Sequence, residues 1–206
     1  MNLAKLTRVS GWILALGGLL LMCAEFVYIL YPGNGTREIT TTSQISAAFF
    51  FSGAVFLAVG LPGVYLRGAQ RSGTFGMVAF LVALTGAALM ISSDWNELFA
   101  GPALMLVPNF DKQFPPSLIA GFMLNYGLYT LGWLLFGISA FRSRTLPRPL
   151  SILLIAGIIL PFVGMFADVQ FPGDFMPCYI GFAWLGLTAA RSVRPSLAPA
   201  AEPVAA

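Results

Sequence analysis

Residues 10–31, SGWILALGGLLLMCAEFVYILY, carry a single charged side chain, Glu25, in an otherwise apolar or small-residue run. A helix needs about 20 mostly apolar residues to cross the roughly 30 Å hydrocarbon core of a bilayer. The run therefore predicts a membrane-spanning helix. Similar runs follow, and we expect six spans, at residues 10–31, 45–66, 73–93, 118–141, 149–168 and 175–190.

The composition of the whole chain agrees with a membrane protein. Charged residues make up 9% of the 206 residues, apolar residues 58%, and the mean hydropathy is +0.83. A soluble domain carries about a quarter charged residues. The sequence therefore predicts an all-α, six-transmembrane-helix bundle of three helical hairpins over residues 1–194. A disordered Ala/Pro-rich tail is expected at residues 195–206, and no separate soluble catalytic domain.

The charges divide between the two sides of the predicted bundle. Seven of the eight acids fall on one side. Nine of the eleven basic residues fall on the other: Lys5, Arg8, Arg67, Arg71, Arg142, Arg144, Arg148, Arg191 and Arg194. Cytoplasmic loops carry the excess of Lys and Arg, so both termini are expected in the cytoplasm. The expected partners are membrane lipids and a membrane protein or further copies of the chain. Nucleic acid is not expected, because the arginines are spread over short loops without interleaved aromatic residues.

Glu25 is the most informative single residue. It lies about six positions inside the outer end of the first span, roughly 9 Å at about 1.5 Å per residue. An ionised carboxylate in the middle of a spanning helix costs on the order of 2.5–3.5 kcal/mol on insertion scales. Glu25 therefore needs a partner, access to water, or a neutral carboxyl group.

Polar residues of the fourth span lie at a depth comparable to that of Glu25. Asn125 and Tyr129 are spaced i, i+4 and share a helix face, with Tyr126 beside them. We hypothesise an outward-opening polar pocket formed by Glu25, Asn125, Tyr126 and Tyr129. The alternative is an interhelical hydrogen bond that fixes helix packing.

Further acids, Asp94, Glu97 and Asp168, are expected around the outer mouth of this pocket, where they would concentrate cations or relay protons. Alternatively, they are solvated helix ends. The apolar segment 94–117 is expected to be a non-spanning interfacial or re-entrant segment across the outer mouth.

Several chemistries are excluded by missing residues. The chain has no histidine, which excludes His-ligated haem or zinc and a His general base. It has no GxxxxGK[ST] phosphate loop. No metal or cofactor is expected. Cys23 and Cys178 form no CxxC pair; we expect two buried small apolar side chains, with a disulfide as the alternative.

A pattern at the end of the fourth span continues through the loop into the fifth. It comprises GWLLFG at residues 132–137, RSRTLPR at 142–148 and IAG at 155–157. This pattern resembles one in small multi-pass bacterial inner-membrane proteins of uncharacterised activity. The resemblance covers about one helix, one loop and half a helix. It implies a helical bundle in the bacterial cytoplasmic membrane and transfers no activity.

Three functions fit these features. The first is a structural or accessory membrane subunit, whose polar residues serve helix packing or a partner. The second is the binding or transport of a lipophilic or cationic small molecule through the polar pocket. The third is a membrane enzyme that uses a carboxylate for acid–base chemistry. The sequence contains no evident catalytic motif.

Overall fold

The computed structural model describes residues 3–30, 41–104, 106, 116–166, 173 and 175–191. The predicted tail at 195–206 lies outside these residues. The elements are α1 (Leu3–Leu30), α2 (Thr41–Trp95), the π-helix η1 (Asn96–Ala100), α3 (Gly101–Leu104), α4 (Pro116–Ser143), α5 (Arg148–Phe166) and α6 (Met176–Arg191). The described residues contain no strand, so the predicted all-α class is confirmed for this part of the chain.

Helix α2 is two helical arms that meet at Gly73. This glycine has non-helical dihedral angles, φ 61° and ψ −165°, and a positive φ is readily adopted only by glycine. The two arms lie side by side. Tyr65 stacks on Phe80 with ring centroids 4.1 Å apart, and Phe51 meets Phe99 edge-on at 6.1 Å. The arms correspond to the second and third predicted spans.

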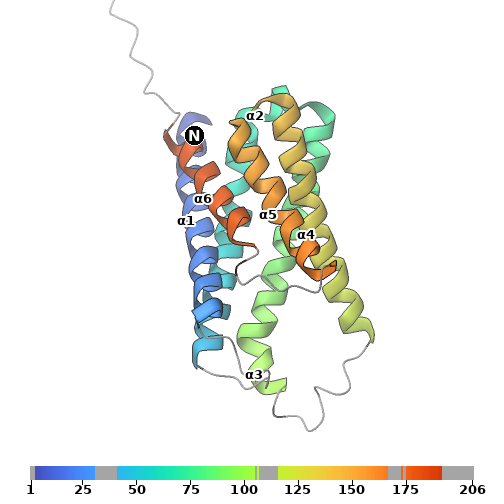
Figure 1. Cartoon of the computed structure of the whole chain (residues 1–206). Coiled ribbons are helices and arrows are strands. Elements are labelled where there is room, and N and C mark those ends of the chain that lie inside the picture. Colours follow the sequence, from blue (N-terminus) through green and yellow to red (C-terminus); the bar gives the residue numbers. More distant parts are fainter. Residues whose placement is uncertain are drawn as a thin grey trace, which may run out of the picture.

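The long helices form a closed ring in the order α1, α2, α4, α5 and α6. Helix α1 packs mainly against α2 and α6, α2 also packs against α4, and α5 lies between α4 and α6 (Figure 1). Glycines allow backbones to approach closely, as is common between membrane helices. A Cβ added to Gly18 would lie 2.4 Å from the backbone nitrogen of Ala183, and one added to Gly132 would lie 2.5 Å from the Cα of Ala83.

Three helical segments are long and apolar enough to cross a membrane: Leu3–Leu30, Ser43–Leu104 and Pro116–Ser143. Arg148–Val163 in α5 is apolar but shorter. Many large apolar side chains face outward, among them Trp12, Val59 and Met123. Large exposed apolar surfaces are typical of contact with lipid or protein. These features support an integral membrane protein.

The helix ends differ from the predicted spans in one important place. The third span was expected to end at residue 93 and to be followed by a non-spanning segment. Instead, helical structure continues through η1 and α3 to Leu104. Pro102 does not prevent this, because proline is tolerated in the first turn of a helix. The prediction of an interfacial or re-entrant segment made no statement about local structure, and it stays a prediction; most of residues 105–115 lie outside the described part.

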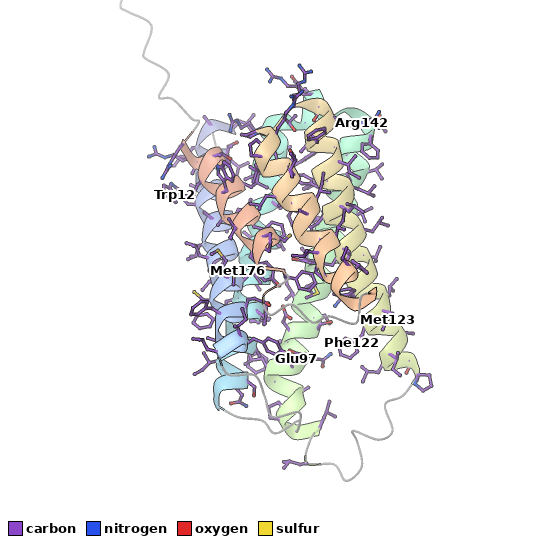
Figure 2. All side chains as sticks on the ribbon, in the orientation of Figure 1. Trp12, Glu97, Phe122, Met123, Arg142 and Met176 are labelled. Atoms are coloured by element: carbon purple, nitrogen blue, oxygen red, sulfur yellow. The ribbon has the colours of Figure 1, made fainter. Side chains whose placement is uncertain are left out.

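The described charges gather at opposite ends of the bundle. The close contacts Gly63–Ser10, Gly11–Ala190 and Gly68–Thr145 bring together the start of α1, the bend of α2, the α4–α5 connection and the end of α6. All described basic residues lie on these segments. Figure 2 shows Arg142 at this end and Glu97 toward the other. We call them the basic end and the acidic end.

Candidate functional site

A buried polar cluster joins α2 to α4 near the acidic end. Asp94, in the last turn of α2, and Asn125, in the third turn of α4, are each 6% exposed. The side-chain amide of Asn125 donates a hydrogen bond through Nδ2 to the hydroxyl oxygen of Ser93. We call Ser93, Asp94 and Asn125 the α2–α4 cluster. It consists of one carboxyl, one amide and one hydroxyl group on facing helices.

Two oxygens of this cluster have no hydrogen-bond partner among the described residues. They are Oδ2 of Asp94 and Oδ1 of Asn125. Buried polar atoms are nearly always paired in native proteins, and leaving one unpaired costs about 1–3 kcal/mol. An ionised carboxylate and an amide carbonyl both accept hydrogen bonds. A bound cation or hydrogen-bond donor would therefore complement the site.

Tyr129 lies one helical turn further along the same face of α4. It is 5% exposed and lies near Asp94, Tyr126, Cys178 and Tyr179. The ring also meets that of Trp133 edge-on at 6.4 Å. Tyr129 thus connects the α2–α4 cluster with the aromatic core.

The close approach of α4 to α2 at this level depends on a glycine. A Cβ added to Gly86 would lie 2.4 Å from the Cα of Tyr129. Such a separation is far below van der Waals contact, so only a residue without a side chain allows this spacing. Gly86 therefore helps to set the position of Tyr129 against α2.

Tyr126 points to a different neighbour. It is 38% exposed, and its ring meets Phe162 of α5 at 5.9 Å and Phe175 at 6.1 Å. Successive helical residues are rotated by about 100°, because a turn contains about 3.6 residues. This places Tyr126 against α5, whereas Asn125 and Tyr129 face α2.

Glu25 is buried, at 7% exposed, on α1. Next to it, the hydroxyl group of Ser46 donates a hydrogen bond of 3.0 Å to the backbone oxygen of Ala24, which ties α1 to the start of α2. The main packing partners of α1 are α2 and α6 rather than α4. Glu25 therefore belongs to a different helix pair from Asn125 and Tyr129.

The remaining predicted acids differ in their surroundings. Glu97 is exposed on η1, close enough to Asp94 for the two carboxylates to repel each other. Asp94 is buried rather than solvated. Asp168 lies outside the described residues. A π-helix such as η1 is rare and frequently occurs at functional sites.

The two cysteines are not joined. Both are free; Cys178 is buried and Cys23 is exposed. The expectation of burial is therefore confirmed for Cys178 and wrong for Cys23, which faces out of the bundle on α1. Among the described residues, no three His, Cys, Asp or Glu side chains gather in a way that could hold a metal ion.

Sequence reasoning missed Ser93 as the partner of Asn125. The only signal was weak: Ser92, Ser93 and Asp94 are three consecutive polar residues at the end of an apolar run. No protein-family model, curated protein or solved structure matches this chain.

Proposed function

We propose that this chain crosses the membrane six times, with its basic end and both termini in the cytoplasm. The two arms of α2 supply two of these crossings. The gathering of the described basic residues at one end supports this orientation under the positive-inside rule. Cysteines placed singly at Arg142 and Glu97 are expected to react with a membrane-impermeant reagent from opposite sides. Labelling of both from one side would refute the orientation.

The resemblance of residues 132–157 to bacterial inner-membrane proteins supports the bacterial cytoplasmic membrane as its location.

Within this topology, the protein binds or transports a cationic small molecule or ion at the α2–α4 cluster. The observation that carries this function is the pair of buried, unpaired acceptor oxygens on Asp94 and Asn125. Two acceptors on facing helices attract a positive group, and no described basic side chain lies at this end of the bundle. Glu97, which is exposed nearby, adds negative charge that would draw cations toward the cluster.

The test is cation binding to the purified protein in phosphatidylcholine nanodiscs. The probes are sodium, potassium, calcium and tetraethylammonium chlorides, each compared with N-methylglucamine chloride at equal ionic strength. At least one probe is expected to raise the thermal unfolding midpoint in a saturable way. Asp94→Asn should weaken that binding by about tenfold or more, since a hydrogen bond to a charged group contributes about 1.5–3 kcal/mol.

The matched control is Glu97→Gln, which removes one negative charge three residues away from an exposed position. It should change the affinity by less than about threefold, because exposed charge interactions are worth about 1 kcal/mol or less. A flat response of the wild-type protein to all four probes would exclude the cation site. So would an affinity that Asp94→Asn leaves unchanged.

A second candidate function is that of an accessory subunit. At the acidic end of α4, every side chain of residues 116–124 is exposed except that of Leu118, which is partly buried. A Cβ added to Gly121 would meet nothing within 4 Å. Residues 116–124 of α4 can therefore contact lipid or another helix on all sides. The accessory function predicts that purification in a gentle detergent retains a stoichiometric protein partner; a lone monomer would count against it.

A further inference from the structure

A cavity opens at the basic end, far from the α2–α4 cluster. Its volume is about 350 Å³, within the roughly 300–1,000 Å³ of small-molecule sites. It lies among the bend of α2, the inner halves of α4 and α6, and the α4–α5 connection. Its Arg, Gln, Ser and Thr lining residues are Arg67, Gln70, Arg71, Ser72, Ser139, Thr145 and Thr188.

The cavity is lined by positive charge and by no acid. Arg67 and Arg71 are four residues apart, so they lie on one face of α2. None of the residues that line the cavity is Asp or Glu. A guanidinium group presents several N–H donors in a planar fork that matches phosphate and carboxylate oxygens. The lining therefore selects for an anion.

The hydroxyl groups at the cavity are largely engaged already. Ser72 donates a hydrogen bond of 2.7 Å to the backbone oxygen of Gly68, and Thr188 donates one of 2.8 Å to that of Leu185. Their protons are thus used within their own helices. The donors that remain for a ligand are chiefly the two guanidinium groups, the amide of Gln70 and the hydroxyl group of Ser139. Binding should accordingly depend on Arg67 and Arg71 more than on the hydroxyl residues.

The lining also contains apolar side chains. Phe136 of α4 and Leu185 of α6 belong to it together with the polar residues. A site of this mixed character suits a phosphate group that carries an organic portion. It lies at the end of the bundle where basic residues gather, which is also where anionic headgroups attract positive charge.

We propose that this cavity binds a phosphate group held by Arg67 and Arg71. Two sources share this chemistry: the headgroup of an anionic phospholipid in the adjacent leaflet, and a free phosphate or phosphomonoester from the aqueous side. The site is separate from the proposed cation site, and either can be correct without the other.

Two measurements distinguish the sources. Native mass spectrometry of the detergent-purified protein, incubated with equal amounts of phosphatidylglycerol and phosphatidylcholine, reports lipid retention. Thermal unfolding in phosphatidylcholine nanodiscs, with sodium phosphate compared with sodium chloride at equal ionic strength, reports free phosphate. A lipid site predicts preferential retention of phosphatidylglycerol; a soluble-phosphate site predicts a saturable rise of the unfolding midpoint with phosphate.

The variant that tests the site is Arg67→Gln combined with Arg71→Gln. Both residues are exposed, so the fold should survive. The affinity for whichever probe binds should fall by about tenfold or more, because charge-assisted hydrogen bonds are about twice as strong as neutral ones. The matched control is Lys5→Gln with Arg8→Gln, which removes two exposed charges from the same end but outside the cavity.

The control should keep the affinity within about threefold of the wild-type value, as expected for exposed charges that act only through the general field. If the control weakens binding as much as the cavity variant does, general attraction to the basic end explains the binding and the site is refuted. The proposal is equally refuted if the wild-type protein neither prefers phosphatidylglycerol nor responds to phosphate.

Discussion

Asp94 at the acidic end and the two cavity arginines at the basic end differ in their burial. At the acidic end, Asp94 is 6% exposed and one of its oxygens has no partner among the described residues. At the basic end, Arg67 and Arg71 are exposed beside a cavity. A buried charge is costly, whereas an exposed one costs little. A change at Asp94 should therefore alter both stability and binding, whereas a change at the two arginines should alter binding alone.

The buried face of α4 runs between these two ends. From the acidic end it carries Asn125, Tyr129, Trp133, Phe136 and Ser139. The middle of this face is aromatic, with ring contacts from Tyr129 to Trp133 and from Trp133 to Phe136. The two ends are thus separated by a packed aromatic core, and they should behave as independent sites as long as α2 and α4 stay in contact.

The largest expected effect comes from breaking the α2–α4 contact at Gly132. A Cβ at this position would lie 2.5 Å from the backbone nitrogen and the Cα of Ala83, so Gly132→Val should force the helices apart. Overpacking typically costs 1–3 kcal/mol and occasionally more; backbone clashes place this variant near the upper end, at about 3 kcal/mol. Thermal unfolding in detergent should show a large fall in the midpoint.

The control for this variant lies on the same helix. Gly127→Val adds the same side chain where a Cβ would meet nothing within 4 Å, so any general effect of valine on the helix is matched. Equal destabilisation by the two variants would mean that the close α2–α4 approach at Gly132 is not what holds these helices together.

An intermediate effect is expected when the buried carboxyl group of Asp94 is replaced. Asp94→Asn should raise the free energy of unfolding of the ligand-free protein by about 1–2 kcal/mol. An amide is cheaper to bury than a carboxylate, and it supplies donors where the carboxylate offers only acceptors. Denaturant titration in micelles measures this change.

The corresponding variant at the basic end, with Arg67→Gln and Arg71→Gln, should stay within about 0.5 kcal/mol of the wild type. A loss of stability in Asp94→Asn would show that the carboxylate is already satisfied.

Some features of the bundle could be predicted from the sequence, and others could not. The length and apolar character of residues 10–31 and 118–141 were sufficient to predict α1 and α4, because crossing a membrane imposes a simple requirement on composition. The depth of a residue in the membrane is a separate matter. Counting from the ends of the expected spans places Glu25 and Asn125 at comparable depths, and this stays a prediction.

It was harder to predict which neighbouring helix each helix face contacts. The i, i+4 spacing correctly put Asn125 and Tyr129 on one face, but nothing in it says which helix that face meets. The neighbour is decided by close backbone contacts such as that between Gly86 and Tyr129, which depend on how two distant segments fit together. For the same reason, the burial of Asp94 and the cavity beside Arg67 could not be predicted from the local sequence.

The smallest expected effect tests whether the exposed surface of α4 at Gly127 is covered by a partner. Gly127 is exposed and has open space around it. In an uncovered helix, Gly127→Ala should raise the free energy of unfolding by about 0.5–1 kcal/mol, since alanine loses less backbone freedom than glycine on folding. A partner helix packed on Gly127 would reverse the sign in the complex, because the added methyl group would meet its backbone. Thermal unfolding of the protein, alone and with any co-purified partner, measures both cases. Stabilisation of both preparations would argue against a partner at this surface.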